Sequence, residues 1–191
     1  MLIVRRYVTF ITIVVNALFE ICNMKALFIT AFTISLISLE AAAQKKVVSG
    51  SFNTLLKMML KHDVKEITVP QAAAKSNVLF IDAREKKEFD VSHIKNAVFG
   101  GYHNFNISTL GNVPKDNEII VYCSIGKRSE NITEKLVKAG YTNVSNLYGG
   151  IFEWVNQGNR VVDINNKNTD KVHAYGKFWG QWLDKGEKVY N

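Results

Sequence analysis

Two short apolar runs, each followed by a helical pattern, constrain most strongly what this chain of 191 residues can fold into. Val78–Ile81, which ends at Asp82, and Glu118–Tyr122 both have the length of a strand. A continuous apolar run of that length is typical of a strand buried on both faces of a parallel sheet. Strands that alternate with helices predict an α/β fold, with a central parallel sheet flanked by helices in three layers.

Shorter signals predict the remaining elements. Ser51 is the expected N-cap of a helix whose apolar residues, from Phe52 to Leu60, recur with a helical period and form a core face. Pro70 suits the first turn of a second helix, and Gly140 suits the end of another. We predict strands at 66–69, 97–99 and 144–147, and helices at 52–60, 70–74, 85–91, 129–139 and from 149 onward.

The first 43 residues are richer in apolar side chains than the rest of the chain. Their apolar runs are shorter than the roughly 20 residues that a membrane-spanning helix needs. Met24-Lys25, the apolar run Ala26–Leu39 and the alanines Ala41–Ala43 match the three parts of a secretory signal peptide. We therefore expect cleavage near Ala43 and a periplasmic or secreted protein. A retained membrane anchor is the alternative, and Met24 is an alternative start.

The remainder is expected to form one domain with two extensions, because neither a repeat nor a low-complexity linker divides it. Residues 44–63 are predicted to form an N-terminal helical extension, and residues 64–162 the domain itself. Residues 163–191 form a C-terminal extension that is expected to pack on the domain, because aromatic side chains seldom stay in solvent. Its aromatic residues include Tyr175, Phe178, Trp179 and Trp182.

Cys123 directly follows the second apolar strand, and cleavage of the leader would leave it as the single cysteine, unable to form an internal disulfide. Sites of open α/β sheets lie at the carboxyl ends of strands. Backbone N–H groups of the following loop, the next helix N-terminus and the cations of Lys127 and Arg128 would all favour a thiolate. We therefore expect the pKa of Cys123 to lie below that of a free thiol.

The chain from about Glu66 to Val162 resembles a rhodanese-like sulfurtransferase domain. The shared motifs are Phe80–Glu85, Glu88-Phe89, His93-Ile94, Ala97, Cys123–Ser129, Gly140-Tyr141, Asn143-Val144, Leu147, Gly149-Gly150 and Trp154. The resemblance implies a three-layer rhodanese-like fold and a single-domain enzyme of the thiosulfate:cyanide sulfurtransferase type, preceded here by the signal peptide.

In the mechanism that this resemblance implies, the catalytic Cys123 takes a sulfane sulfur from a donor such as thiosulfate. The resulting persulfide passes its outer sulfur to an acceptor such as cyanide or a thiol. Amides of the loop would stabilise the persulfide, and Lys127 and Arg128 would attract the anionic donor. The residues expected to bind substrate are Ser124, Ile125, Gly126, Lys127, Arg128 and Ser129.

Asp82 and Arg84 match the family motif after the first strand, and supporting, structural roles are expected for them. Arg84 can reach Glu88 or tie adjacent loops together. His93 is expected to make a structural hydrogen bond. Neither a cofactor nor a metal site is expected, because the four histidines lack the spacing of metal ligands.

The partners that we expect are a small anionic sulfur donor and a thiol or cyanide acceptor, which can be a protein. Nucleic acid is not expected, because the net charge of +7 is dispersed. We expect a monomer.

Two other functions compete with the transferase. The related cell-cycle phosphatases carry an arginine six positions after the cysteine, whereas Arg128 stands five positions after Cys123 and Ser129 occupies the sixth. The shorter loop suits sulfur better than phosphate. The second alternative is a periplasmic persulfide carrier or redox-sensing module that loads sulfur on Cys123 without turnover.

Overall fold

The computed structural model describes residues 47–190. They belong to one of the two compact units of the chain, Lys46–Asn191. The expected signal peptide, with cleavage near Ala43 or a start at Met24, lies outside the described residues. No helix within the described part of the chain is both long and apolar enough to cross a membrane.

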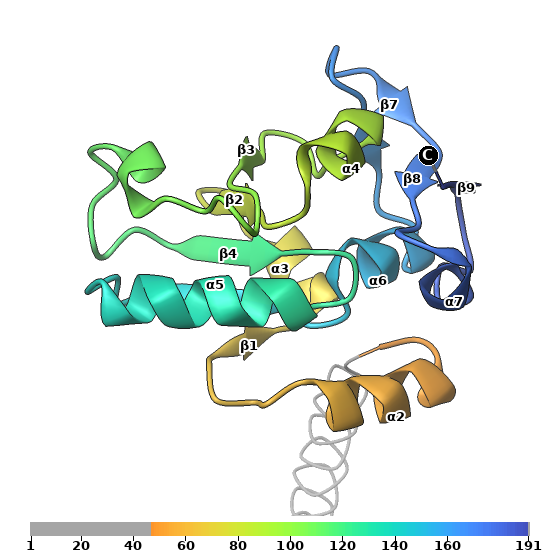
Figure 1. Cartoon of the computed structure of the whole chain (residues 1–191), viewed down its shortest axis with the longest axis horizontal. Helices are drawn as coiled ribbons and strands as arrows, with labels where there is room; N and C mark the ends of the chain where they lie inside the picture. The colour runs from red at the N-terminus through yellow and green to blue at the C-terminus, as the bar shows by residue number, and fades with distance from the viewer. Residues whose placement is uncertain (1–46, 191) are drawn as a thin grey trace, which may run out of the picture. The chain divides into compact units, whose positions relative to one another are not determined.

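A five-stranded parallel sheet forms the centre of this unit, as predicted (Figure 1). Its longest strands pair in register, with Ile81 opposite Val121. In spatial order the strands are β1 (Glu66–Ile67), β5 (Val144–Leu147), β4 (Ile119–Tyr122), β2 (Leu79–Asp82) and β3 (Val98–Phe99). Because β4 is the middle strand, all four of its residues are buried.

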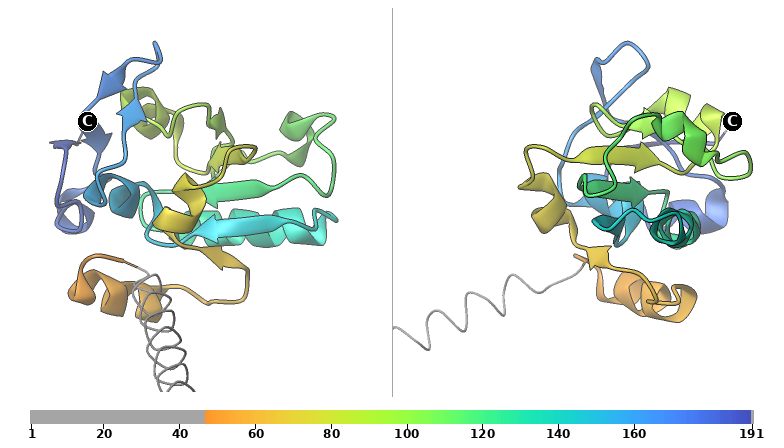
Figure 2. Two further views of the ribbon diagram at one scale, coloured as in Figure 1. Left: turned by 180° about the vertical axis from the view of Figure 1, so that it is seen from behind. Right: turned by 90° about the vertical axis from the view of Figure 1, so that its left-hand side faces the viewer.

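Alternate residues of β4 point into two separate cores. Ile120 and Tyr122 pack with α2 (Gly50–Met59), α3 (Val69–Ala73) and α6 (Gly150–Asn156). Ile119 and Val121 pack instead with α5 (Lys127–Lys138), beside the short 3-10 helix η1 (Ile107–Leu110). Figure 2 shows α3 and α5 on opposite sides of the sheet. The predicted three-layer α/β fold is confirmed.

The predicted helix start at Ser51 is wrong by two positions. α2 begins at Gly50, and its N-cap is Ser49, whose Oγ accepts a hydrogen bond of 3.4 Å from the N–H of Phe52. Ser49 has the extended conformation that a cap requires (φ −87°, ψ 126°). Phe52 and Leu56 are completely buried, which agrees with the predicted core face.

The other helices lie close to their predicted positions. Pro70 occupies the first turn of α3, as expected. α4 (Lys86–Val91) begins one residue later than predicted, because Glu85 serves as its N-cap. Glu88 lies in the first turn of α4, and its side chain accepts a hydrogen bond of 2.9 Å from the N–H of Glu85.

After α6 the chain forms two small sheets around a short helix. They comprise β6 (Val161–Val162), antiparallel to β7 (Asn168–Thr169), and β8 (Lys171–His173), parallel to β9 (Glu187–Val189), with α7 (Lys177–Gly180) between β8 and β9. The ring of Trp182 stacks on that of Phe52, with centroids 5.5 Å apart and planes 15° apart. This stack joins α2 to the C-terminal extension.

Candidate active site

Cys123 lies at the carboxyl end of the central strand and is 1% exposed. Its Sγ accepts a hydrogen bond of 3.2 Å from the N–H of Gly126. Gly126 has a left-handed conformation, with φ 109°, and caps α5. This turn leaves three residues between Cys123 and the helix, so α5 begins at Lys127 and not at Ser129 as predicted. The N–H groups of the first helical turn, which have no partners within a helix, therefore lie close to Cys123 in the sequence.

Backbone N–H groups at the start of α6 bind carbonyl groups of the cysteine loop. The N–H of Ile151 donates to the carbonyl of Cys123 at 2.9 Å, and that of Phe152 donates to the carbonyl of Ser124 at 3.1 Å. Gly150 permits this approach, because a Cβ at that position would lie 2.3 Å from the carbonyl oxygen of Cys123. The two carbonyl groups are thus occupied by α6.

Asn146 on β5 fixes the other end of the loop. Its Nδ2 donates to the carbonyl of Gly126 at 3.0 Å, and its Oδ1 accepts a hydrogen bond of 2.7 Å from Ser129 Oγ. The hydroxyl of Ser129 is therefore engaged with the sheet, so any role of Ser129 in binding substrate falls to its backbone. Asn146 is not recognisable as part of the site from the sequence, because an isolated Asn in a strand carries no signal of its partners.

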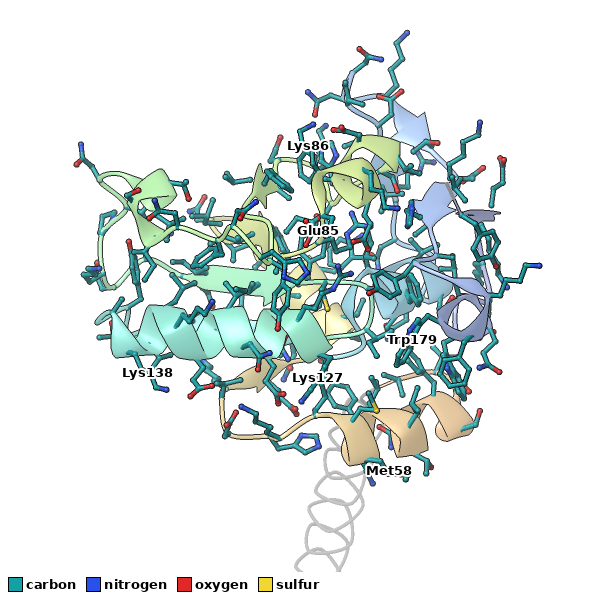
Figure 3. All side chains as sticks on the ribbon, in the orientation of Figure 1. Met58, Glu85, Lys86, Lys127, Lys138 and Trp179 are labelled. Carbon is teal, nitrogen blue, oxygen red and sulfur yellow. The ribbon has the colours of Figure 1, made fainter. Side chains whose placement is uncertain are left out.

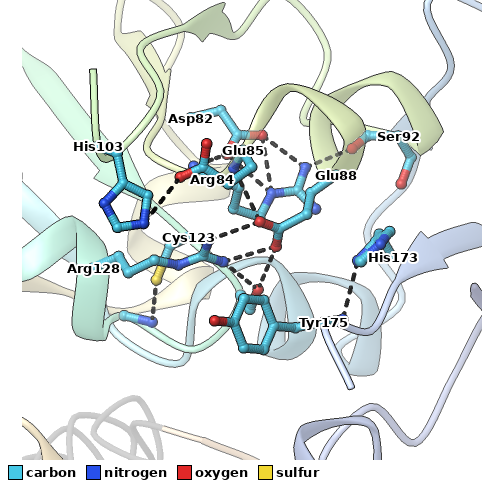
Figure 4. A network of polar contacts seen from close by, with 12 residues as sticks. Asp82, Arg84, Glu85, Glu88, Ser92, His103, Cys123, Arg128, His173 and Tyr175 are labelled. Carbon is cyan, nitrogen blue, oxygen red and sulfur yellow. Dashed lines mark hydrogen bonds and ion pairs between the residues drawn. The ribbon is translucent and has the colours of Figure 1, made fainter. Parts of the chain in front are cut away.

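Arg128 forms a two-pronged ion pair with Glu88 of α4 (Figure 4). Both contacts, Nη1 to Oε2 and Nη2 to Oε1, measure 2.7 Å. Ser124 Oγ joins the pair: it accepts from Arg128 at 3.0 Å and donates to Glu88 at 3.2 Å. Of the two roles expected for Arg84, the contact with Glu88 is therefore not the one seen, because Glu88 is bound by Arg128.

This pair changes how readily its carboxyl group takes up a proton. Burial alone would raise the pKa of Glu88, but the hydrogen bonds and the charge of Arg128 outweigh burial and lower the pKa. Burial likewise acts to lower the pKa of Arg128, and the contact with Glu88 outweighs it and raises the pKa. Both groups are therefore charged at neutral pH.

Arg84 forms a second pair, with Asp82, that is closed to solvent on both sides. Its Nη2 donates to Asp82 Oδ2 at 2.7 Å and to the carbonyl of Ser92 at 2.6 Å. These contacts tie the end of β2 to the end of α4, which is the second of the two structural roles expected for Arg84. Asp82 and Arg84 do not line the pocket described below.

Lys127 is paired as well. Its Nζ lies 3.2 Å from Glu130 Oε2. The other carboxylate oxygen of Glu130 accepts hydrogen bonds from the N–H groups of Lys61 and His62, at 2.8 and 2.9 Å. The two cations that were expected to attract an anionic donor thus each face a buried carboxylate. The sequence hid the pairing of Arg128, because Glu88 is 40 residues away along the chain.

A pocket of about 210 Å³ lies beside the cysteine. Three parts of the chain line it: the end of α2, the cysteine loop with the start of α5, and the C-terminal extension. Its lining residues are Met59, Cys123, Ser124, Ile125, Lys127, Arg128, Tyr175 and Trp179. Figure 3 shows the side chains of the described residues, with Lys127 and Trp179 labelled. Met59 was predicted to belong to a core face, and neither Tyr175 nor Trp179 was predicted to belong to the site.

Tyr175 covers the guanidinium group of Arg128. The Arg128 Cζ lies 4.9 Å from the centre of the Tyr175 ring, which is a cation–π distance. Tyr175 has φ 63°, a conformation that is uncommon for a residue with a side chain. Its N–H donates to His173 Nδ1 at 3.1 Å, and this bond helps to fix the turn (Figure 4).

His93 has the structural role that was expected of it. Its Nδ1 lies within hydrogen-bond distance, 3.1 Å, of the carbonyl of Phe89, and its ring stacks on the Phe89 ring. Its backbone pairs with Val162 at the start of the extension. Among residues 47–190, no three His, Cys, Asp or Glu side chains are grouped so that they could hold a metal ion.

Comparison with known proteins agrees with this architecture. A family model described as the rhodanese-like domain matches residues 68–157. A sulfurtransferase of Allochromatium vinosum is 34% identical over 86 residues, which are 45% of this chain and 79% of that protein. A tRNA uridine(34) hydroxylase of Aster yellows witches'-broom phytoplasma is 33% identical over 89 residues, which are 44% of this chain but 29% of that protein.

Among solved structures, a rhodanese-like domain protein from Staphylococcus aureus is 24% identical, with a TM-score of 0.43. The similarity covers 47% of this chain and 90% of that one. The matched family model and the extent of the similarity to the Allochromatium protein assign the chain plainly: it belongs to the rhodanese-like domain family.

Proposed function

We propose that the chain is a sulfurtransferase that carries sulfur as a persulfide on Cys123. One observation carries the proposal. Cys123 lies between the central strand and the start of α5, its sulfur accepts the Gly126 N–H, and it lines a pocket. Cys123 is 1% exposed as a whole residue, and the pocket that it lines is the route by which a donor would approach it.

The reaction proceeds in two displacements. The Cys123 thiolate attacks the outer sulfur of thiosulfate, a new S–S bond forms, and sulfite leaves with the electron pair of the old S–S bond. Cyanide or a thiolate then attacks the outer sulfur of the persulfide and leaves as thiocyanate or a new persulfide, which restores the thiolate. N–H groups of the loop and the α5 N-terminus stabilise the anionic sulfur throughout.

The contacts of Arg128 favour sulfur transfer over phosphate hydrolysis. A phosphatase needs the arginine after its cysteine to be free to hold phosphate. Here both terminal nitrogens of Arg128 bind Glu88 at 2.7 Å. Arg128 therefore fixes the loop to α4 and forms one wall of the pocket.

Turnover of thiosulfate and cyanide by the full-length protein tests this function. We expect Cys123→Ser to abolish thiocyanate formation. Cys22→Ser, the change at the other cysteine of the sequence, is expected to leave it intact. Mass spectrometry of the wild type after incubation with donor alone is expected to find one added sulfur atom on Cys123. Turnover that survives Cys123→Ser overturns the proposal, and loading without turnover supports the carrier instead.

Substrates, partners and location belong to the same proposal. The chain spans 27–29% of the length of the matched tRNA uridine(34) hydroxylases, so hydroxylation is not proposed for it. We propose a monomer that is exported from the cytoplasm, takes sulfur from a small anionic donor and passes it to a small thiol, cyanide or a protein thiol. The N-terminal sequence of the protein recovered from cells tests the location.

A further inference from the structure

The pocket beside Cys123 has less free positive charge than its sequence suggests. Arg128 is paired with Glu88, and Lys127 with Glu130. These four side chains together have no net charge. A dianion such as thiosulfate would have to lose water without gaining an unpaired cation, and the cost of removing an ion from water rises steeply with its charge.

The walls of the pocket are apolar where they come from outside the cysteine loop. Met59 at the end of α2 and Tyr175 and Trp179 of the extension all line it. All three lie outside residues 68–157, the range matched by the family model. The pocket of about 210 Å³ has room for a ring, since an apolar cavity of about 150 Å³ can hold benzene.

Its walls are held in place by contacts away from the sulfur. Trp182, three residues after Trp179, stacks on Phe52 of α2. The N–H of Tyr175 is bonded to the buried His173. The side of the pocket opposite the loop is therefore a built part of the fold, formed by two segments that are distant in sequence.

From these contacts we infer that the site prefers a singly charged sulfur donor carrying an apolar group, and that Met59, Tyr175 and Trp179 determine this preference. The inference rests on the proposed function and names the substrate class of the same site. The single charge of the donor faces the N–H groups of the loop, and its apolar group lies against the aromatic wall.

An organic thiosulfonate, R–SO2–S⁻, is a probe with this chemistry. The Cys123 thiolate attacks the terminal sulfur, the bond between that sulfur and the sulfonyl sulfur breaks, and the sulfinate R–SO2⁻ leaves with its electron pair. The total charge is −2 before and after the step. The product on the protein is the same persulfide that thiosulfate gives, so the same acceptor completes the cycle.

Three donors separate the effect of charge from that of the apolar walls. Thiosulfate is a dianion, methanethiosulfonate is a monoanion with a methyl group, and benzenethiosulfonate is a monoanion with a ring. With the full-length protein and saturating cyanide, we expect kcat/KM to rise from the first to the third. The last two should differ by roughly tenfold, as expected for burial of a ring.

Matched variants locate the cause of the preference. Met59→Ala and Trp179→Ala are expected to reduce the ratio of benzenethiosulfonate to methanethiosulfonate kcat/KM severalfold. Met58→Ala alters a neighbouring methionine that is 81% exposed and is expected to leave the ratio unchanged. Tyr175→Asn removes a ring at an exposed position and introduces a residue that tolerates positive φ. This variant tests the same ratio if Trp179→Ala fails to fold.

Each result decides between the two proposals. Wild-type turnover that depends on Cys123 but is fastest with thiosulfate overturns the inference and leaves the proposed function standing. A ring preference that is equal in Met58→Ala, Met59→Ala and Tyr175→Asn also overturns it. Absence of both turnover and sulfur loading with all three donors overturns both proposals.

Discussion

The two buried arginine–carboxylate pairs of this domain have the same chemistry and different surroundings. Arg84 and Asp82 form a sealed pair, meaning that both side chains are 0% exposed to solvent. In the second pair Glu88 is 1% exposed, but the side chain of Arg128 is 17% exposed and lines the pocket. The first pair joins two backbone segments, and the second forms a wall beside the reactive sulfur. Access to solvent therefore separates a structural pair from one that contacts the site.

Both pairs meet on α4. Arg84 reaches the carbonyl of Ser92, just after this helix, and Arg128 reaches Glu88 within it. Asp82 and Arg84 are two residues apart, whereas Arg128 and Glu88 are 40 residues apart. The local pair can form as soon as the strand ends, but the distant pair requires the folded domain. α4 thus connects the supporting structure to the cysteine loop.

The largest effect is expected from breaking the sealed pair. Arg84→Met leaves the carboxylate of Asp82 buried without its partner and is expected to lower the free energy of unfolding by about 3–5 kcal/mol. Denaturant titration measures this change. The double variant Asp82→Asn, Arg84→Met removes both charges and is expected to recover part of the loss. A single-variant loss below about 1 kcal/mol would show that the sealed pair is dispensable.

Opening the second pair should cost less stability and alter donor choice. Glu88→Gln keeps the shape of the side chain and frees the charge of Arg128, which solvent can partly reach, so we expect a loss of about 1–3 kcal/mol. The freed cation should raise kcat/KM for thiosulfate relative to methanethiosulfonate. Asp90→Asn is the matched control on the same helix, since Asp90 pairs with the exposed Lys86. If Glu88→Gln left the ratio of thiosulfate to methanethiosulfonate kcat/KM unchanged, the pairing of Arg128 would not determine the choice of donor.

Acid should weaken the second pair in a defined direction. The pKa of Glu88 is lowered in the folded protein, so the stability that its ionisation contributes is fully present above its ordinary pKa of 4.5. That contribution is lost as pH falls through the lower, folded-state value. The difference in free energy of unfolding between wild type and Glu88→Gln is therefore expected to be constant near neutral pH and to shrink below about pH 4.5. If the difference in free energy of unfolding grew as the pH fell, the pKa of Glu88 would be raised in the folded protein and not lowered.

The smallest effect on stability is expected at Tyr175. Tyr175→Asn removes a cation–π contact of about 0.5–1 kcal/mol with Arg128. The strain of a positive φ is lower for Asn than for Tyr, which offsets part of that loss. Thermal unfolding is expected to shift by a few degrees at most. A loss as large as that of Glu88→Gln would contradict this expectation and show that the ring contributes to stability as much as the carboxylate does.

What the sequence could predict followed from local signals. The apolar runs at 78–82 and 118–122 indicated the buried strands, and the position of Cys123 after the second indicated where the site would lie. The sequence left two roles open for Arg84, a contact with Glu88 or a tie between loops, because Arg128, the observed partner of Glu88, is 40 residues away along the chain. The loop length was also misjudged, since the positive φ of Gly126 starts α5 two residues early. No local signal assigned Met59, Tyr175 and Trp179 to the pocket, because they come from segments far from the cysteine loop in the sequence.

The stack of Trp182 on Phe52 bears on how the pocket beside Cys123 can be redesigned. Two segments outside the cysteine loop line this pocket, namely the end of α2 and the C-terminal extension. Because of this stack, the position of each segment depends on the other, and exchanging α2 alone would leave Trp182 without the ring of Phe52. A chimera in which α2 and the C-terminal extension are exchanged together can acquire a new substrate range and keep the cysteine loop and its sheet unchanged.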